Sequence, residues 1–408
     1  MTTRRLFVKS SAMAMLSMGF APAFLARAAE AAGSRPRLLI AIFQRGAADG
    51  LNIVVPYGEA EYYRLRPTIA VPRPGTADAA ALDLDGHFGL HPALAPLKPF
   101  WDNKSLAIVH ASGSPDSTRS HFDAQDYMES ATPGVKSTSD GWLNRYLAST
   151  AVARNPLRGV ALARQMPRSL QGPSPALAIG SVAEFAVRGG AGASFEAAYL
   201  RGADAALAQS SAEAFEAMRT LQRAAAAPRV TSATVAYPRS PFGQALREIA
   251  SVAKADVGLE VAFAESTNWD HHVNEGGASG QLALRVDDLS RGIAALAADL
   301  GERMADTVIL TMSEFGRRAA QNGSGGTDHG HGNAMFMLGG PVRGGQVYGR
   351  WPGLREDALF DGRDLAVTTD FRDVFAEVAT AHLGADRSAL ARIFPGYTST
   401  TRLGLLRT

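Results

Sequence analysis

The chain contains no cysteine. Disulfide frameworks, thiolate zinc sites, iron–sulfur clusters and cysteine nucleophiles are therefore excluded, because each depends on a cysteine sulfur. Any metal must instead be held by His, Asp, Glu, Asn or hydroxyl groups. The 408 residues are 46% hydrophobic and 20% charged, with 41 Gly and 21 Pro. That composition is typical of a globular protein with a sizeable core in one or two domains.

No charge of one sign dominates the chain once its first 28 residues are set apart. Those residues hold four bases and no acid, so 37 bases and 39 acids remain, and the formal net charge changes from +2 to about −2. No run rich in Lys and Arg is present, which argues against nucleic-acid binding. No later stretch is long and apolar enough to span a bilayer.

The first 28 residues have the layout of an export signal. Arg-Arg-Leu-Phe at 4–7 precedes a weakly apolar stretch at 10–25 and a small-x-small cleavage site at 26–28. This layout predicts a cleaved bacterial twin-arginine signal, with the twin-arginine translocase as partner and a periplasmic or secreted product. The alternatives are a basic amphipathic start and an uncleaved anchor, for which the apolar stretch is short and polar. Because this pathway carries folded proteins, often with metal bound, it mildly indicates a metal site.

Short apolar runs of strand length recur along the rest of the chain, at 37–43, 105–110, 160–163, 258–264, 307–312 and 334–338. Because they are continuously apolar rather than alternating, they predict a sheet that is buried on both faces. Helical patterns follow, at 240–255, 282–300 and 370–384. We therefore predict an α/β fold with a mostly parallel central sheet. A single domain is expected over 29–408, with a helical insertion at about 190–256.

Histidines collect where the predicted strands end. In open parallel sheets, ligands bind beyond the carboxyl ends of the strands. Five of the nine histidines lie in such loops, with aspartates close by in the sequence: His121, His271, His272, His329 and His331. The sequence therefore predicts that the functional site lies at one edge of the sheet.

The sharpest signal among these is Asp328-His329-x-His331, which is flanked by glycines. Imidazole nitrogen and carboxylate oxygen are the usual ligands for Zn, Mn or Fe when thiolates are absent, and glycines allow tight backbone turns. The alternative is a surface turn with solvated histidines. Asp270 and His272 follow another strand, where a capping aspartate and an exposed histidine are the alternative. Together the two groups predict one metal site.

Two further carboxylates are weaker metal ligands by the same reasoning. Glu314 follows the strand at 307–312, and its alternative role is an ion pair with Arg317 or Arg318. Asp49 follows the first strand, and its alternative role is that of a turn or cap residue.

Hydroxyls and a cation share the loop after the second strand. Thr118 and Ser120 flank Arg119. A nucleophilic hydroxyl beside a cation and a divalent metal suits phosphoryl or sulfuryl transfer, because negative charge develops on the transferred group. An ordinary serine-rich loop is the alternative. The motifs GxSxG, GxxxxGK[ST] and HExxH are absent, and no GxGxxG follows the first strand, so elbow-type serine hydrolases, P-loop enzymes and dinucleotide enzymes have little support.

Several of these segments resemble a known family. The twin-arginine start, RGAADGLN, SHFDAQD, WDHH, SEFGRR and GTDHGHGN are similar to the large bacterial exported family of unknown function numbered 1501, DUF1501. The resemblance covers about 37–385. That family is in turn similar to the alkaline phosphatase superfamily, which includes sulfatases, phosphatases and cofactor-independent phosphoglycerate mutases.

The resemblance implies an alkaline phosphatase-like three-layer sandwich and an exported metal-dependent hydrolase of phosphate or sulfate esters. One or two divalent ions (Zn, Mn, Fe or Ca) would be held by residues drawn from Asp49, Asp270, His272, Glu314, Asp328, His329 and His331. Ser120 or Thr118 would attack the ester, or a metal-activated water would do so instead. Arg45 or Arg119 would neutralise the anionic substrate.

Two departures from the superfamily pattern keep other functions open. Phe315 stands where the superfamily has a metal-binding histidine, and without cysteine there is no formylglycine and no conventional sulfatase mechanism. A second hypothesis is therefore a non-catalytic exported protein that binds or assembles a polysaccharide or a protein partner on the same scaffold. A third is a metal-assisted sugar or peptide hydrolase. Whether the chain is an enzyme stays open at this point.

Overall fold

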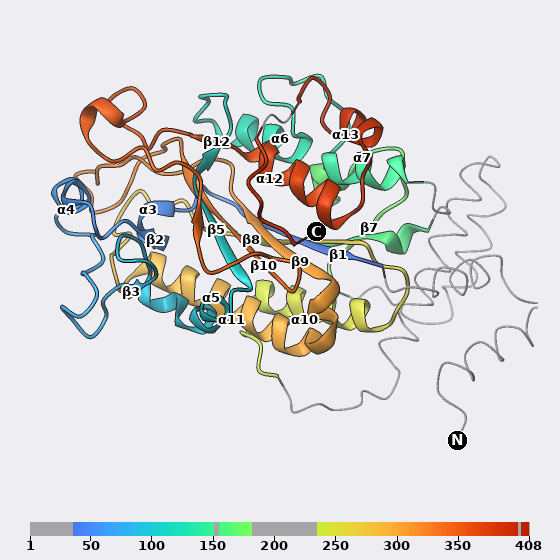
Figure 1. Cartoon of the computed structure of the whole chain (residues 1–408), viewed down its shortest axis with the longest axis horizontal. Helices are drawn as coiled ribbons and strands as arrows, with labels where there is room; N and C mark the ends of the chain where they lie inside the picture. The colour runs from blue at the N-terminus through green and yellow to red at the C-terminus, as the bar shows by residue number, and fades with distance from the viewer. Residues whose placement is uncertain (1–35, 151–154, 182–234, 399–400, 408) are drawn as a thin grey trace, which may run out of the picture.

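A computed structural model describes residues 36–150, 155–181, 235–398 and 401–407 (Figure 1). The predicted export signal at 1–28 lies outside these residues, as does most of the predicted helical insertion, 190–234. Among the described helices, none combines the length and apolar character needed to cross a bilayer.

A nine-stranded sheet runs through the middle of the molecule (Figure 1). Its strands are β1 (Leu38–Gln44), β5 (Leu106–Gly113), β6 (Gly159–Leu162), β7 (Leu177–Ile179), β8 (Val261–Ser266), β9 (Thr307–Met312), β10 (Asn333–Gly339), β11 (Val347–Tyr348) and β12 (Thr369–Asp370). Their order is β11-β5-β10-β9-β1-β8-β6-β7, and β12 also pairs with β5. β10 is antiparallel to both of its neighbours, and the other pairings described in this sheet are parallel. The predicted mostly parallel α/β sheet and its six predicted strands are confirmed.

Helices cover both faces of the sheet (Figure 1). One face carries η1 (Pro92–Leu97), α5 (Lys98–Asp102), α10 (Pro241–Lys254) and α11 (Gln281–Leu300). The other carries α6 (His121–Ser130), α7 (Trp142–Ser149), α12 (Phe371–Glu377) and α13 (Arg387–Ile393). Alternate residues of β1 enter the two cores, with Ile40 and Ile42 in one and Ala41 and Phe43 in the other. This is the expected three-layer arrangement.

Local chemistry explains where the predicted helices begin. The hydroxyl of Ser240 accepts a hydrogen bond from the Gly243 amide, and Pro241 occupies the first turn of α10. The carboxylate of Asp370 accepts one from the Arg372 amide at the start of α12. α11 buries its whole predicted stripe, which consists of Leu282, Val286, Leu289, Ile293, Leu296 and Leu300.

Shorter elements complete the described fold. A three-stranded sheet pairs β2 (Val54–Val55) with β4 (Gly89–Leu90) and β4 with β3 (Leu82–Asp83). The remaining short helices are α3 (Gly50–Ile53), α4 (Ala60–Leu65), η2 (Pro156–Arg158), η3 (Arg168–Leu170), η4 (Gly301–Asp306), η5 (Glu356–Ala358) and η6 (Val378–His382).

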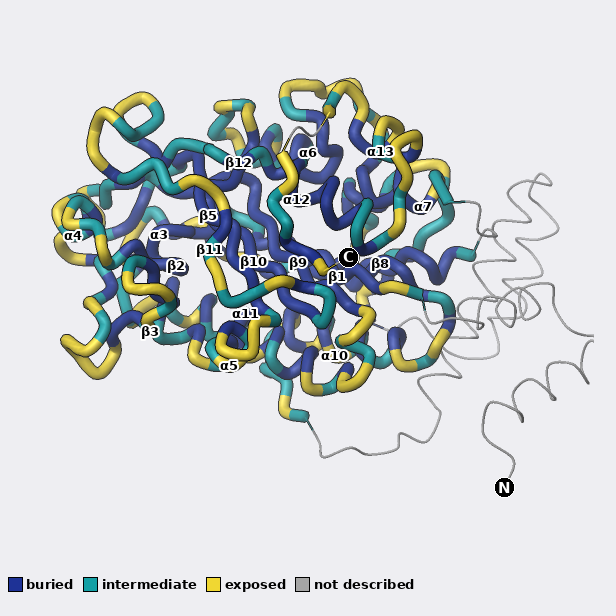
Figure 2. Tube along the Cα trace, in the orientation of Figure 1, coloured by how far each residue is buried: buried dark blue, intermediate teal, exposed yellow. Residues whose placement is uncertain are grey.

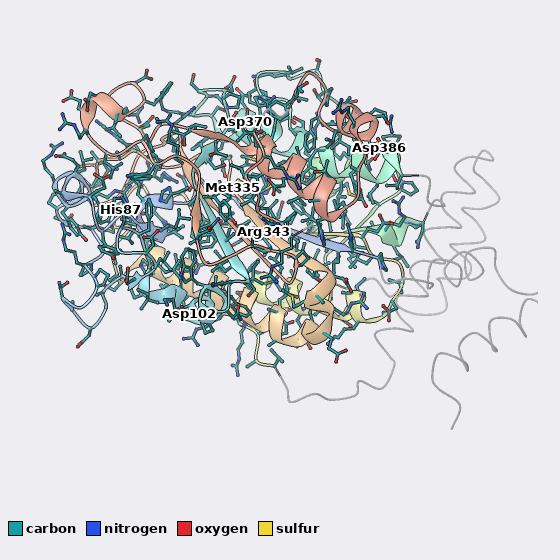
Figure 3. The ribbon with its side chains drawn as sticks, in the orientation of Figure 1. His87, Asp102, Met335, Arg343, Asp370 and Asp386 are labelled. Carbon is teal, nitrogen blue, oxygen red and sulfur yellow. The ribbon has the colours of Figure 1, made fainter. Side chains whose placement is uncertain are left out.

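Burial follows the layers. Figure 2 shows the strands of the large sheet as buried and the peripheral loops as exposed. Met335 of β10 lies in the core, whereas Asp102 and Asp386 lie at the periphery (Figure 3). Because β1, β5, β8 and β9 run in one direction, their carboxyl ends meet at one edge of the sheet. The antiparallel strand β10 begins at that same edge, which brings the preceding loop there too.

Candidate metal centre

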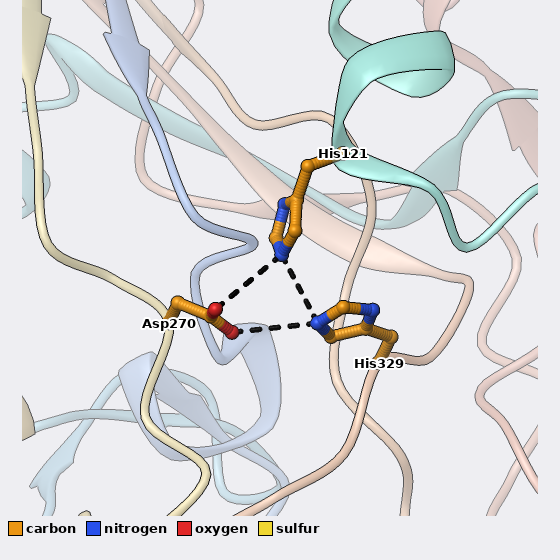
Figure 4. A group of neighbouring side chains, drawn as sticks. All are labelled: His121, Asp270 and His329. Carbon is orange, nitrogen blue, oxygen red and sulfur yellow. Dashed lines mark hydrogen bonds and ion pairs between the residues drawn. The ribbon is translucent and has the colours of Figure 1, made fainter.

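Three side chains from distant parts of the sequence converge at this edge (Figure 4). They are His121, Asp270 and His329, and one ligand atom of each lies within 4.8 Å of the other two. The Nε2 atoms of His121 and His329 are 3.0 Å apart. The Asp270 carboxylate oxygens lie 3.6 Å from His121 Nε2 and 3.4 Å from His329 Nε2. His272 adjoins the group, with its Nε2 3.0 Å from both His329 Nε2 and Asp270 Oδ1.

The strands described above deliver these ligands. His121 is the first residue of α6, after the loop that follows β5. Asp270 and His272 follow β8, and His329 lies in the segment between β9 and β10. An isolated antiparallel bridge joins Arg317 to His329, so the two ends of that segment lie side by side.

Hydrogen bonds to the far ring nitrogens orient two of the histidines. His329 Nδ1 lies 2.9 Å from the carbonyl oxygen of Arg119. A carbonyl only accepts, so this assigns the proton to Nδ1 and leaves a lone pair on Nε2 of the neutral ring. His121 Nδ1 likewise lies 2.8 Å from Glu314 Oε1. Two neutral rings held in this way direct lone pairs at each other across 3.0 Å, and a positive species between them, a proton or a metal ion, stabilises the arrangement.

Glu314 lies behind the cluster rather than in it. Its buried carboxylate accepts hydrogen bonds from the Gly46 amide and the Gln125 amide group, both at 2.8 Å, besides its bond with His121. Burial acts to raise the pKa of Glu314, but the bonds from His121 and Gln125 hold it below its ordinary value. The bond to Glu314 in turn raises the pKa of His121. The sequence predicts a metal ligand or an ion pair with Arg317 or Arg318 here, whereas the structure has a carboxylate that positions His121.

Arg317 ties the strand ends together. Its buried guanidinium donates to the carbonyl oxygens of Ala47 at 2.6 Å and Thr327 at 3.1 Å, and to Asp270 Oδ1 at 2.6 Å. Burial acts to raise the pKa of Asp270, but Arg317 lowers it, so the carboxylate is ionised at ordinary pH. The Asp270 side chain is still 45% exposed. It therefore has a free side toward the solvent.

Two glycines permit the close approach of these loops. Gly46 has a φ of +114°, and a Cβ there would lie 2.8 Å from the Asp270 backbone nitrogen. A Cβ on Gly330, next to His329, would clash with the backbone of Arg317. From the sequence, the glycines around Asp328-His329-x-His331 are interpreted as allowing the backbone to fold around an ion. In the structure, Gly330 instead allows two loops to pack closely.

Asp49 and His331, two predicted ligands, do not belong to the group. The buried Asp49 carboxylate forms a two-pronged ion pair with Arg66, whose charge lowers the pKa of Asp49 against the opposing effect of burial. Burial, together with neighbouring Asp49, raises the pKa of Glu275 well above its ordinary value. His331 stacks on Phe360 with ring centroids 4.5 Å apart, and burial lowers its pKa. Asp49 is therefore engaged by an arginine, and His331 lies against an aromatic ring away from the cluster.

Asp328 and His271 adjoin the cluster without entering it. Asp328 Oδ1 accepts from Asn322 Nδ2 at 3.1 Å and lies 3.5 Å from His272 Nδ1, where it orients that ring. His271 is buried, and burial lowers its pKa to about 4. Of the two adjacent histidines, only His272 faces the ligands.

The predicted hydroxyls lie directly before His121. Ser120 is exposed and occupies the N-cap position of α6. The Thr118 hydroxyl accepts a hydrogen bond from the Ser120 amide at 3.2 Å. Ser120 therefore has the more accessible hydroxyl of the two.

Both predicted substrate-binding arginines are paired with carboxylates. Arg119 donates from Nε to Asp364 Oδ2 at 3.0 Å. Arg45 donates to Glu265 at 2.7 Å and to Glu129 at 2.8 Å. The charge of each guanidinium is therefore balanced within the protein.

Two important residues were not selected from the sequence. His121 counts among the strand-end histidines, but its partner Glu314 is 193 residues away, so no local motif marks it as a ligand. Arg317 enters the sequence analysis only as a partner for Glu314, and its contacts to three loops have no signal in the sequence.

The family-model comparison agrees with the resemblance to the family noted from the sequence. The family model described as "Protein of unknown function (DUF1501)" matches residues 101–394. No curated protein matches the chain. Among solved structures, the PsFucS1 sulfatase from Pseudoalteromonas sp. is similar, with 13% identity and a TM-score of 0.39, over 100% of this chain and 76% of that chain.

Proposed function

The chain belongs to the DUF1501 family, and we propose that it is an exported metal-dependent hydrolase of phosphate or sulfate esters. The observation that carries this proposal is the 3.0 Å approach of two imidazole nitrogens, Nε2 of His121 and Nε2 of His329, beside the ionised Asp270 carboxylate. Protein groups fix the far nitrogen of each ring, as is usual for metal-binding histidines.

The donor set indicates which ion would bind. His121, His329 and Asp270 would hold one divalent ion, with His272 as a fourth ligand. Three imidazoles and one carboxylate suit Zn, Mn or Fe better than Ca, which prefers oxygen ligands. The ion would supply Lewis-acid polarisation of the ester.

The other residues would support the reaction through their own contacts. Glu314 keeps His121 in its ring orientation, and Arg317 keeps Asp270 ionised. Ser120 is the hydroxyl that we propose as the attacking group, with Thr118 or a water molecule as the alternative. Arg45 and Arg119 would contribute to anion binding only in part, because carboxylates already balance them.

Metal content and ester hydrolysis test this proposal together. The chain from residue 29 onward, purified without chelator, should contain about one equivalent of Zn, Mn or Fe by plasma mass spectrometry. It should also hydrolyse a nitrophenyl phosphate or sulfate. His329→Ala should lose both properties, whereas His331→Ala, the matched control outside the cluster, should keep the metal. Full metal content in His329→Ala would contradict the proposed site.

One observation favours a second function. The buried Phe315 ring packs against His121 and His329, with ring centroids 5.0 and 5.1 Å apart, and takes the place of a further ligand. We therefore keep as the alternative a non-catalytic exported protein that holds a polysaccharide or a protein partner. Bound metal without hydrolysis of any ester would favour it.

A further inference from the structure

A cavity of about 500 Å³ lies at the same edge of the sheet, beyond the ends of β1, β6 and β8. Its walls include Arg45, Gln125, Arg164, Gln165, Arg168 and Glu265. Gln125 links the cavity to the candidate metal site. The Gln125 side-chain amide donates to Glu314, and Glu314 in turn forms a hydrogen bond with His121. The cavity and the cluster are therefore two hydrogen bonds apart.

The three arginines of the cavity wall differ in how they are paired. Arg45 is paired with Glu129 and Glu265, and Arg168 lies 3.1 Å from Asp126. Arg164 is exposed and has no ion pair or hydrogen bond within the described ranges. An anionic group would find a free guanidinium there.

An exposed aromatic side chain lies on α6, the helix that contributes Gln125 to the cavity wall. Phe122 is 89% exposed and directly follows His121. Positions 122, 125, 126 and 129 share one face of α6 because of their helical spacing. Gln125 and Glu129 on that face contact Arg45, and Asp126 contacts Arg168. Phe122 therefore lies one turn from the cavity wall, on its side of the helix.

We propose that this cavity binds the ring of an acidic sugar whose ester group lies at the metal cluster. Arg164 would bind a second anionic group on the sugar, and Phe122 would stack on the apolar face of the ring. The planar polar groups of Gln125, Gln165 and Glu265 suit several hydroxyls, whereas a nucleobase would need a flat apolar slot. The position of the ester rests on the proposed function, but the binding of the sugar does not.

Calorimetric titration of the metal-loaded chain from residue 29 onward tests the sugar site. The probes are glucuronate, glucose 6-sulfate and glucose 6-phosphate, with neutral glucose for comparison. Phe122→Ala should weaken binding of all four about tenfold. Arg164→Gln should weaken only glucuronate by a similar factor, because the single anionic group of each ester probe would lie at the candidate metal site. Leu284→Ala, an exposed apolar residue on α11, and Arg247→Gln, an exposed arginine on α10, are the matched controls and should bind as wild type.

The outcomes separate this inference from the proposed function. Failure to bind any acidic sugar, or wild-type affinity in both cavity variants, overturns the sugar site even if nitrophenyl esters are hydrolysed. Binding that depends on Phe122 and Arg164, with no ester hydrolysed, supports the sugar site while the hydrolase proposal fails. Metal content, measured in each variant, verifies that the cluster is intact.

Discussion

An aspartate paired with an arginine follows each of two neighbouring parallel strands, β1 and β8. The two aspartates differ in what their surroundings allow them to do. After β1, Asp49 is almost fully buried and held by Arg66. After β8, Asp270 is held by Arg317 on one side but is 45% exposed on the other, where His121 and His329 direct their Nε2 atoms. A buried carboxylate that is paired with a buried guanidinium serves stability. A carboxylate with a free side next to oriented imidazoles is available to a ligand.

The largest effect should come from Asp270→Asn. The amide removes the only charged ligand of the cluster, so we expect metal affinity to fall at least 100-fold, with elemental analysis showing almost none bound. Because Asp270 also pairs with the buried Arg317, the variant should lose some stability too, and circular dichroism should verify that it is folded under the conditions of the metal measurement. Wild-type metal content would show that Asp270 is not a ligand and that its role, like that of Asp49, is structural.

Asp49→Asn should lower stability without lowering the metal content. It leaves the buried Arg66 guanidinium without its counter-charge, which typically destabilises a protein by about 3–5 kcal/mol. Urea unfolding would measure the loss, and the folded protein should keep its metal. A variant with normal stability and no metal would reverse the roles of the two aspartates.

Glu314→Gln should have an intermediate effect on the cluster. The buried amide can still accept a hydrogen bond from His121, but it no longer supplies a negative charge behind the ring. Loss of such a supporting group typically weakens metal binding about 10–100-fold. Competition with a chelator of known affinity would measure this, with Glu265→Gln as a control carboxylate that does not contact His121. Equal affinities in both variants would contradict the positioning role of Glu314.

The smallest effect concerns histidines that lie outside the cluster. Burial lowers the pKa of His110 and His382 to about 4, whereas the hydrogen bond with Glu314 raises the pKa of His121. Between about pH 6.5, the ordinary histidine value, and pH 4, the unfolded chain binds protons that the folded His110 and His382 do not. Their contribution to stability is therefore complete above about pH 6.5 and declines as the pH falls toward 4.

Urea unfolding at pH 7 and pH 4.5 would measure this decline. His382→Asn replaces a titrating ring with a neutral donor near the carbonyl oxygen of Leu38, so the difference between the two pH values should shrink. An unchanged difference would mean that other groups cause the acid sensitivity.

Much of the fold was predictable because its elements carry strong patterns. Six continuous apolar runs and the stripe of α11 are long enough to be recognised. The two-residue strands β2, β3 and β4 are too short to show any periodicity. The direction of β10 was not predictable either, since a run that is apolar throughout is compatible with parallel and antiparallel pairing.

The site was predictable only where its ligands form local patterns. Asp270, His272 and His329 lie in short motifs after or before strands, and the structure brings them together. Whether a carboxylate is already occupied depends on partners elsewhere, such as Arg66 for Asp49 and His121 for Glu314. These partners cannot be identified from sequence spacing. Asp49 and Glu314 therefore seemed as suitable for metal binding as Asp270.

Because the candidate ligands come from distant parts of the sequence, metal binding would also affect the stability of this chain, which has no cysteine. His121 and His329 are 208 residues apart in the sequence, and His272 and His329 are 57 apart. One ion bound by these rings would cross-link three segments and close two large loops. A covalent link across loops of this size restricts the unfolded chain by on the order of 4 kcal/mol. The metal would thus give this protein a reversible equivalent of a disulfide bond.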